Sequence, residues 1–172
     1  MAKAYFVAGL AGSGKSYYSR KIAKELDLKI IDFDDNFNEF IAAHKDEYES
    51  LGSEKFLANY ASTRYADLIN RAVTQLQQDV SVVIAAPFSK QMQDQKLWDE
   101  LISPIKKFDL QPTLYWVVIS DELRKKRLVT RGEKRDAEKI KKIDEYISLS
   151  PAKPPVVEHI LVQGDKGIEL AQ

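Results

Sequence analysis

Short apolar runs alternate with segments of helical spacing along the chain. The apolar runs are rich in β-branched and aromatic residues and predict strands at residues 4–8, 28–31, 80–86, 113–119 and 159–162. Apolar residues at intervals of three and four predict a long helix that carries Leu57, Ala61, Tyr65, Leu68, Ala72 and Leu76. Nearly continuous apolar strands that alternate with helices are typical of a parallel sheet covered on both faces. The pattern therefore predicts a three-layer α/β fold.

Composition narrows the class of protein. The 172 residues, 44% of them hydrophobic, can bury one substantial core, so we expect a single domain over 1–172. Lys plus Arg and Asp plus Glu both number 26, so no overall charge favours a nucleic acid or a membrane as partner. The absence of cysteine excludes disulfides and thiolate chemistry. No apolar run approaches about 18 residues and no export signal is evident, so we expect a cytoplasmic protein.

A phosphate-binding motif follows the first predicted strand. Residues 9–16 read GLAGSGKS and match the pattern G-x-x-x-x-G-K-[ST]. Glycines let the backbone N–H groups turn toward phosphate oxygens, Lys15 adds a positive charge, and the Ser16 hydroxyl can ligate Mg²⁺. A helix that begins at the end of the loop directs its N-terminal dipole at the same anion. The residues predicted to bind nucleotide here are Gly9, Ala11, Gly12, Ser13, Gly14, Lys15 and Ser16.

An acidic cluster follows the second predicted strand. Asp32 and Asp34 are two residues apart, and in an extended segment their side chains point the same way, toward the phosphate loop. One carboxylate can accept the proton of an attacking hydroxyl while the other holds Mg²⁺ through water. The alternative is a solvated acidic turn that caps the next helix, the role we expect for Asp35.

An arginine-rich helix follows the fourth predicted strand. It is predicted to begin after Ser120 and to break at Gly132, within a lid at about 120–138. Arg124, Arg127 and Arg131 are three and four residues apart and share one helical face. Permanently charged arginines suit the charge that develops when a phosphoryl group is transferred. The alternative is a solvated basic face.

Ligands of open parallel sheets bind beyond the carboxyl ends of the strands. The segments that follow the third and fifth predicted strands, Pro87-Phe88-Ser89 and Gly164-Asp165, should therefore reach the same cleft as the motifs above. Residues 36–65 are dense in aromatic side chains, which either stack on an acceptor or form a local core. We expect Arg64 to pair with a neighbouring carboxylate, and Phe88 either to wall an acceptor pocket or to pack in the core.

The segments GLAGSGKS, IDFDD, VVIAAPFSK and LRKKRLVTRGEKRDAEK together resemble a group of P-loop kinases. The group includes polynucleotide 5′-kinases, zeta-toxin-like kinases and small bacterial and phage ATP-binding proteins. The resemblance implies a five-stranded sheet of order 2-3-1-4-5 and adenine binding between the lid near Arg127 and Gly164-Asp165. It implies that Lys15 and Ser16 hold phosphates and Mg²⁺, that Asp34 is the general base, and that Arg131 and Arg127 are lid arginines that contact the phosphates.

The sequence departs from this group at two positions. Tyr17 stands where many relatives have Thr, and the third strand ends Ala85-Ala86-Pro87 without an acidic residue. The metal would then depend on Ser16, Asp32 and water.

These observations predict an ATP- and Mg²⁺-dependent phosphotransferase. The expected acceptor is a hydroxyl of a small molecule such as a nucleoside, nucleotide or sugar. Two alternatives stay open: a kinase of polynucleotide 5′-hydroxyls, which balanced charge disfavours, and a nucleotide-dependent switch or slow NTPase that acts through a protein partner.

Overall fold

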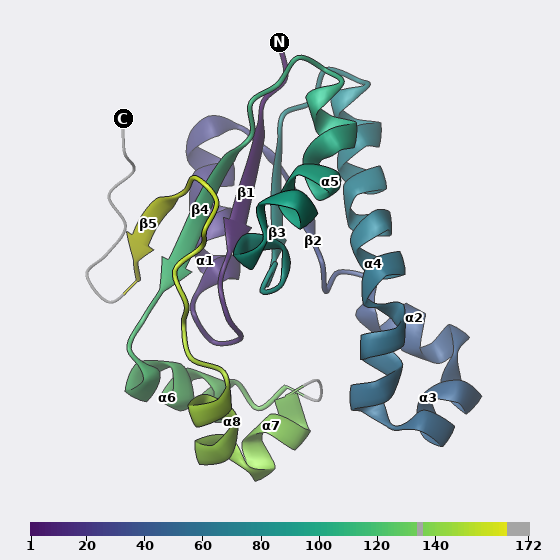
Figure 1. Ribbon diagram of the computed structural model, residues 1–172, viewed down its shortest axis with the longest axis vertical. Coiled ribbons are helices and arrows are strands. Elements are labelled where there is room, and N and C mark those ends of the chain that lie inside the picture. Colours follow the sequence, from purple (N-terminus) through teal and green to yellow (C-terminus); the bar gives the residue numbers. More distant parts are fainter. Residues whose placement is uncertain (134–135, 165–172) are drawn as a thin grey trace.

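A computed structural model describes residues 1–133 and 136–164 (Figure 1). Five parallel strands form a sheet of order β2-β3-β1-β4-β5, which confirms the expected topology. The strands are β1 (Ala4–Ala8), β2 (Lys29–Asp32), β3 (Val82–Ala86), β4 (Thr113–Val118) and β5 (Ile160–Gln163). Their bounds differ from the predicted ones by at most two residues, and β3 starts later because Asp79 turns the chain with φ 58°.

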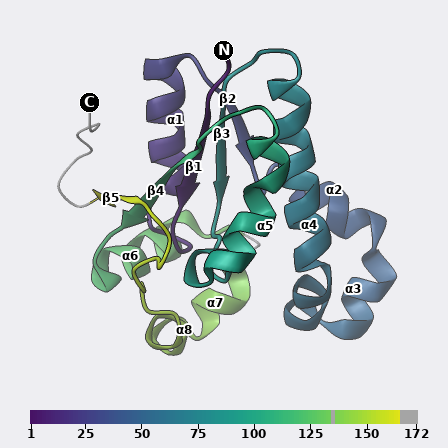
Figure 2. The ribbon, with the colours of Figure 1, turned by 45° about the horizontal axis from the view of Figure 1, so that its top comes forward.

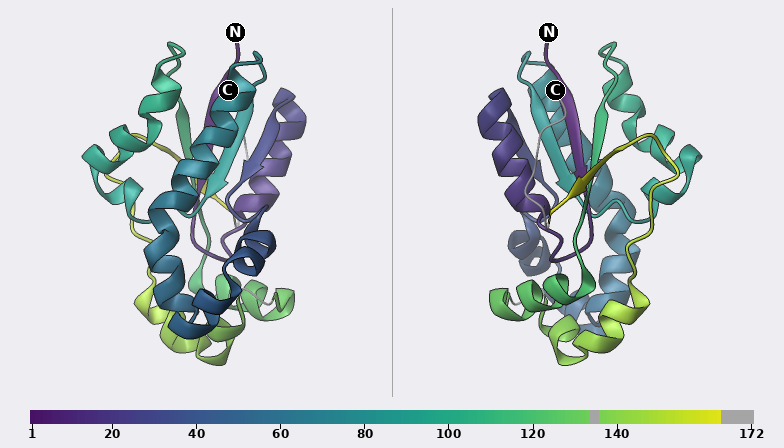
Figure 3. Two further views of the ribbon diagram at one scale, coloured as in Figure 1. Left: turned by 90° about the vertical axis from the view of Figure 1, so that its right-hand side faces the viewer. Right: turned by 90° about the vertical axis from the view of Figure 1, so that its left-hand side faces the viewer.

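Helices cover both faces of the sheet, as the apolar strands predict. α1 (Lys15–Leu26) packs on one face, where its Tyr18 and Ile22 meet Val7 and Val83. α4 (Ser53–Leu76) and α5 (Gln95–Lys106) cover the other face, and α1 and α5 lie on opposite sides of the strands (Figure 3). A short 3-10 helix, η1 (Gln91–Gln93), precedes α5.

Two helical regions extend beyond the carboxyl ends of the strands (Figures 1 and 2). The first, here named the aromatic lobe, comprises α2 (Phe37–Ala43), α3 (Lys45–Leu51) and the N-terminal half of α4. The second, here named the lid, comprises α6 (Asp121–Arg131), α7 (Ala137–Lys141) and α8 (Ile143–Leu149), and so continues past the predicted limit at 138. The position of both regions places any cleft between them at the edge where ligands bind.

Local sequence explains the bounds of the lid helix. The Ser120 hydroxyl accepts a hydrogen bond from the backbone N–H of Leu123 at 3.3 Å, which caps α6. Gly132 ends the helix with φ 56°, a left-handed conformation that glycine adopts readily. Both boundaries agree with the prediction. Among residues 1–133 and 136–164, no helix is long and apolar enough to cross a membrane.

Candidate functional site: two cavities that meet at the phosphate loop

The phosphate loop connects β1 to α1, which begins at Lys15 as predicted. Gly14 precedes the helix with φ 102°, and Gly12 has φ 81°, so both positions favour glycine. A Cβ atom at Gly12 would lie 3.0 Å from the carbonyl oxygen of Arg124 in α6. The bare glycine therefore lets the lid helix rest directly on the loop.

Polar groups of the loop face inward. The Lys15 ammonium donates to the carbonyl oxygen of Leu10 at 3.3 Å. The Ser13 hydroxyl is buried, and it finds no hydrogen-bond partner among the described residues. A buried polar atom without a partner is costly, and a phosphate oxygen would satisfy it.

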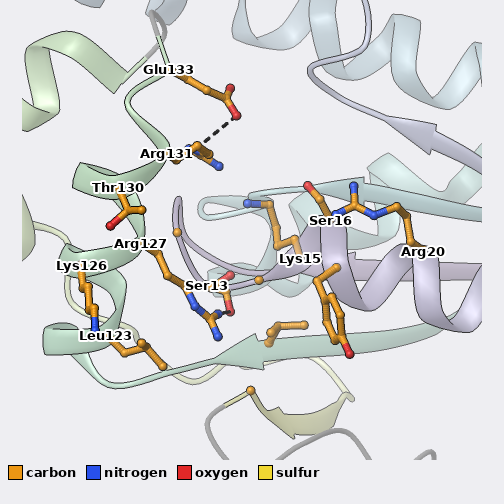
Figure 4. Close-up of a pocket in the computed structure, with 15 residues that line it drawn as sticks. Ser13, Lys15, Ser16, Arg20, Leu123, Lys126, Arg127, Thr130, Arg131 and Glu133 are labelled. Atoms are coloured by element: carbon orange, nitrogen blue, oxygen red, sulfur yellow. Dashed lines mark hydrogen bonds and ion pairs between the residues drawn. The ribbon is translucent and has the colours of Figure 1, made fainter.

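The loop forms one wall of a cavity of about 790 Å³, shown in Figure 4. The first turns of α1, the inner face of α6, Val117 and Gly164 form the other walls, while Asp165 lies outside the described residues. The charged side chains around this cavity are Lys15, Arg20, Lys126, Arg127 and Arg131, opposed by Glu133. This excess of positive charge suits a polyphosphate.

Arg127 and Arg131, the two arginines that the resemblance singles out, lie on the cavity side of α6. The Arg127 guanidinium donates to the backbone oxygen of Ser13 at 3.3 Å, so it already contacts the phosphate loop (Figure 4). Arg131 pairs with Glu133 at 3.3 Å and with Asp136, to which its Nε donates at 3.1 Å. Both arginines are thus placed at the cavity by contacts within the chain.

Asp136 is fully buried and also pairs with Lys139 at 3.1 Å. Burial acts to raise the pKa of Asp136. The hydrogen bond from Arg131 and the charge of Lys139 outweigh this effect and hold the pKa below its ordinary value. The carboxylate therefore stays ionised and holds the side chains of Arg131 and Lys139 in place. Asp136 was not predicted as a site residue, although it lies five residues from Arg131 and three from Lys139 in the sequence.

Arg124 fits neither of the roles that the sequence left open, a phosphate contact or a solvated basic face. Its side chain is only 2% exposed, donates to the Ser150 hydroxyl at 2.9 Å and pairs with Asp121 at 3.4 Å. It therefore joins the end of α8 to α6 and does not line the cavity of about 790 Å³.

The acidic cluster lies near the loop, but not in the predicted extended conformation. Asp32 ends β2, and residues 33–36 turn, so that the Asp32 carboxylate accepts the backbone N–H of Asp34 at 2.9 Å. Burial raises the pKa of Asp32. Asp35 does not cap α2: its carboxylate accepts the N–H of Asp32 at 3.2 Å and pairs with Arg71 at 3.9 Å. Tight turns favour such local bonds between Asp side chains and backbone, which overrode the strand pattern.

A second cavity, of about 320 Å³, lies between the phosphate loop, the acidic turn, the aromatic lobe and the lid. Asp32 and Asp34 line it, as does Ala11 of the loop. Lys15, Ser16 and Arg131 line both cavities. The two cavities therefore adjoin at the residues that the motifs single out, whereas Gly9 lines neither.

Arg64, in α4, holds the acidic turn in place. Its guanidinium donates to the backbone oxygen of Phe33 at 3.0 Å, pairs with Asp34 at 3.8 Å and lies 4.0 Å from the centre of the Phe33 ring. The expected pairing with a neighbouring carboxylate is confirmed. Its place in the second cavity was not predicted, because the turn that brings Asp34 to α4 has no clear sequence signal.

The aromatic residues divide between core and cavity. Phe88 is fully buried and packs on Phe6 and Trp98, so it does not wall an acceptor pocket. Phe40, His44, Phe56 and Tyr60 pack on one another as a small core of the aromatic lobe. Phe33, Phe37 and Tyr65 line the second cavity.

Mg²⁺ fits the residues at the junction. Among the described residues, no group of three or more His, Asp or Glu side chains can hold a metal ion by itself. Mg²⁺ at nucleotide sites commonly takes one or two protein oxygens and completes its shell with phosphate oxygens and water. Ser16 and Asp32 both face the second cavity and supply a hydroxyl and a carboxylate of that kind.

This combination of parallel sheet, phosphate loop and basic cavity defines a P-loop nucleotide-binding protein. A family model described as the AAA domain matches residues 5–147, so the chain belongs to that family. No curated protein matches the sequence.

Solved structures share the fold at low identity. A provisionally named kinase from Chloroflexus aurantiacus J-10-fl has TM-score 0.64 and 18% identity, over 94% of this chain and 86% of that one. The APS kinase CysC of Mycobacterium tuberculosis, in complex with AMPPNP and APS, has TM-score 0.60 and 15% identity, over 96% and 90%. A sugar kinase from Janibacter sp. HTCC2649 has TM-score 0.59 and 14% identity, over 95% and 86%.

Proposed function

We propose that the protein is an ATP- and Mg²⁺-dependent kinase that transfers a phosphoryl group to a hydroxyl of a small molecule. The observation that carries the proposal is that two cavities adjoin at Lys15, Ser16 and Arg131. A kinase needs this arrangement, because the donor and acceptor must approach each other in line at one phosphorus atom. A protein that only binds nucleotide has no need of the second cavity.

The larger cavity holds the donor in this proposal. Lys15 and the loop N–H groups bind the phosphates, and the buried Ser13 hydroxyl gains a partner there. Arg127 and Arg131 stabilise the negative charge that spreads over the transferred phosphoryl oxygens. When bound, Mg²⁺ neutralises phosphate charge, and Ser16 and Asp32 are the residues that hold it.

The smaller cavity holds the acceptor. A bond forms between the acceptor oxygen and the γ-phosphorus, the bond from that phosphorus to the β-phosphate oxygen breaks, and ADP leaves. The hydroxyl proton passes to the Asp34 carboxylate, which lines this cavity. Arg64 keeps Asp34 in position through its ion pair. The lid and the loop together exclude water, which would otherwise compete as acceptor.

The structural neighbours support the reaction class without defining the substrate. Two of them are named as kinases of small molecules, a sugar in one case and APS in the other. Their low identity leaves the acceptor of this chain to its own residues.

The proposal is tested by incubating the protein with γ-labelled ATP, Mg²⁺ and a pooled panel of nucleosides, nucleotides, sugars, aminoglycosides and 5′-hydroxyl oligonucleotides. We expect a labelled small molecule that is absent when Lys15→Ala replaces the wild type. Label in oligonucleotides alone would make the protein a polynucleotide kinase. Absence of any labelled product, with ATP binding intact, would overturn the proposal and favour a nucleotide-dependent switch.

A further inference from the structure

The apolar stripe of α4 continues beyond the sheet that it covers. Leu68, Ala72 and Leu76 are buried in the main core, whereas Leu57 and Ala61, on the same stripe, are half-buried and line the second cavity. A helix of 24 residues is about 36 Å long, and a strand of five residues spans about 17 Å. Figure 1 shows the lower half of α4 past the ends of the strands. Leu57 and Ala61 therefore face the second cavity and do not pack on the sheet.

Aromatic rings complete this wall of the cavity. The rings of Phe33 and Tyr65 lie 4.6 Å apart at 30°, and Phe37 stands at the start of α2 beside them. Burial raises the pKa of Tyr65 to about 12, so its hydroxyl contributes no charge. These rings and the stripe of α4 thus form an apolar wall, bordered by the Arg64 guanidinium, which lies 4.0 Å from the centre of the Phe33 ring and 5.3 Å from that of Phe37.

The positive charges of the same cavity are matched within the chain. Arg64 pairs with Asp34, and Lys139 and Arg131 both pair with the buried Asp136. Lys15 belongs to the phosphate loop and also faces the nucleotide cavity. Asp32 adds a further carboxylate. Four basic side chains thus face three acids in the second cavity, whereas five basic side chains face one acid in the nucleotide cavity. The surplus of positive charge in the second cavity is therefore much smaller.

From these contacts we infer that the acceptor is a compact, uncharged polyhydroxy compound with one apolar ring face, of the size of a nucleoside or an aryl glycoside. The inference rests on the proposed kinase function and narrows its substrate. An apolar face packs against the stripe of α4 and the Phe33 and Phe37 rings. The hydroxyl edge faces Asp34. A phosphate on the acceptor would meet carboxylates and cations that are already paired, at a cost in binding. The volume of about 320 Å³ lies at the low end for ligand pockets.

The charge preference is tested with two probes that share a free 5′-hydroxyl, cytidine and cytidine 3′-monophosphate. Binding of each to the protein loaded with Mg²⁺ and a non-hydrolysable ATP analogue is measured by saturation-transfer NMR. We expect cytidine to bind at least about tenfold more tightly. Equal or tighter binding of the 3′-monophosphate, or no binding of either probe, overturns the inference.

The apolar face is tested with phenyl β-glucoside and methyl β-glucoside, measured in the same way. We expect the phenyl compound to bind about five- to tenfold more tightly, since its ring gains contact with the aromatic wall. In Phe37→Ala this ratio should fall to about one, and in Asn38→Ala, an exposed neighbour in the same helix, it should be unchanged. Urea unfolding of both variants checks that α2 is retained. A ratio of one in the wild type overturns the inference.

Failure of this inference and failure of the proposed function give different results. If a charged compound binds preferentially and receives label from ATP, the kinase function stands and the inference on its acceptor is wrong. If the uncharged probes bind as expected and no panel compound ever receives label, the cavity assignment stands and the kinase function is wrong.

Discussion

Asp34 and Gly12 show how single residues connect this fold to its site. Asp34 lies in a turn that no strand pattern predicts, and a buried arginine from α4 keeps it at the cavity. Gly12 is favoured for two separate reasons, since its φ is 81° and a Cβ atom there would lie only 3.0 Å from atoms of α6, which would have to shift. The role of each residue leads to a prediction that a conservative substitution can test.

Replacing Asp34 by Asn should remove the proton acceptor and preserve the shape of the turn. We expect kcat for phosphoryl transfer to fall by about 10²- to 10⁴-fold, with KM for ATP changed by less than about threefold. Steady-state kinetics with the acceptor found in the labelling experiment measure both constants. An unchanged kcat would show that another group takes the proton.

Gly12→Ala should damage the protein more than Gly52→Ala. Both glycines have positive φ, at 81° and 76°, but a Cβ atom at Gly52 meets nothing within 4 Å. Gly52 also has ψ 157°, a conformation open almost only to glycine, so we expect backbone strain of about 1–3 kcal/mol in each variant. We expect about 1–3 kcal/mol more at Gly12, from displacement of α6. Urea unfolding measures the free energies.

Nucleotide affinity separates the two glycine variants further. It should fall in Gly12→Ala, because the loop and α6 both border the nucleotide cavity, and should be retained in Gly52→Ala. Equal unfolding free energies together with equal affinities would contradict the close packing of the lid on the loop.

Among the elements, α6 connects the lid to both cavities through charged contacts. Arg124 attaches α8, Arg127 contacts the phosphate loop, and Arg131 is held by Asp136 at the start of α7. The stability of the lid therefore depends on a buried carboxylate, and through it on pH.

Asp136→Asn should lower the free energy of unfolding by about 2–4 kcal/mol at pH 7, because two cations lose their buried partner. The pKa of Asp136 is lowered in the folded protein, so the carboxylate contributes its full stability above the unfolded value of 3.8. That contribution is lost as the pH falls from 3.8 through the lower pKa that Asp136 has in the folded protein. The difference between wild type and variant should accordingly be nearly equal at pH 7 and pH 5 and should shrink as pH falls below about 4.

Urea unfolding at pH 7, 5 and 3 measures this difference. Asp144→Asn is a matched control, since Asp144 pairs with Lys125 on the same lid but its side chain is 83% exposed, and we expect little effect. A difference for Asp136→Asn that is constant across these pH values would contradict the assigned ion pairs.

Much of the fold could be predicted from the sequence, because its signals are local. The apolar strands, the phosphate loop, the Ser120 cap and the break at Gly132 each depend on neighbouring residues. The arrangement of charges could not be predicted in the same way. Arg124 and Arg131 look equivalent on a helical wheel, and only the packing of α8 and α7 determines that one joins helices and the other borders both cavities. The turn after Asp32 was missed because its stabilising bonds form between side chain and backbone.

In the molecule as a whole, the sheet is a rigid base and the binding surfaces lie past its carboxyl end. The nucleotide cavity touches the loop, α1, α6 and Gly164, so a bound nucleotide contacts segments from both ends of the sequence. Binding should therefore stabilise the entire protein against unfolding.

ATP with Mg²⁺ at about 100 times its Kd should stabilise the folded state by about 2.7 kcal/mol and raise Tm by about 5 to 11 °C. Differential scanning fluorimetry measures the shift. In Lys15→Ala the shift should be absent or much reduced, and in Asn38→Ala it should be retained. Equal shifts in Tm for the wild type and Lys15→Ala would show that the nucleotide does not bind at the phosphate loop.

The length of α4 also has an evolutionary consequence. Its turns over the sheet are constrained by the core, but Leu57 and Ala61 have no strand beneath them. Substitutions at these two positions should reshape the second cavity at little cost to folding. If the proposed kinase function holds, selection could change the preferred substrate without altering the phosphate loop, so that one scaffold could serve kinases for many different alcohols.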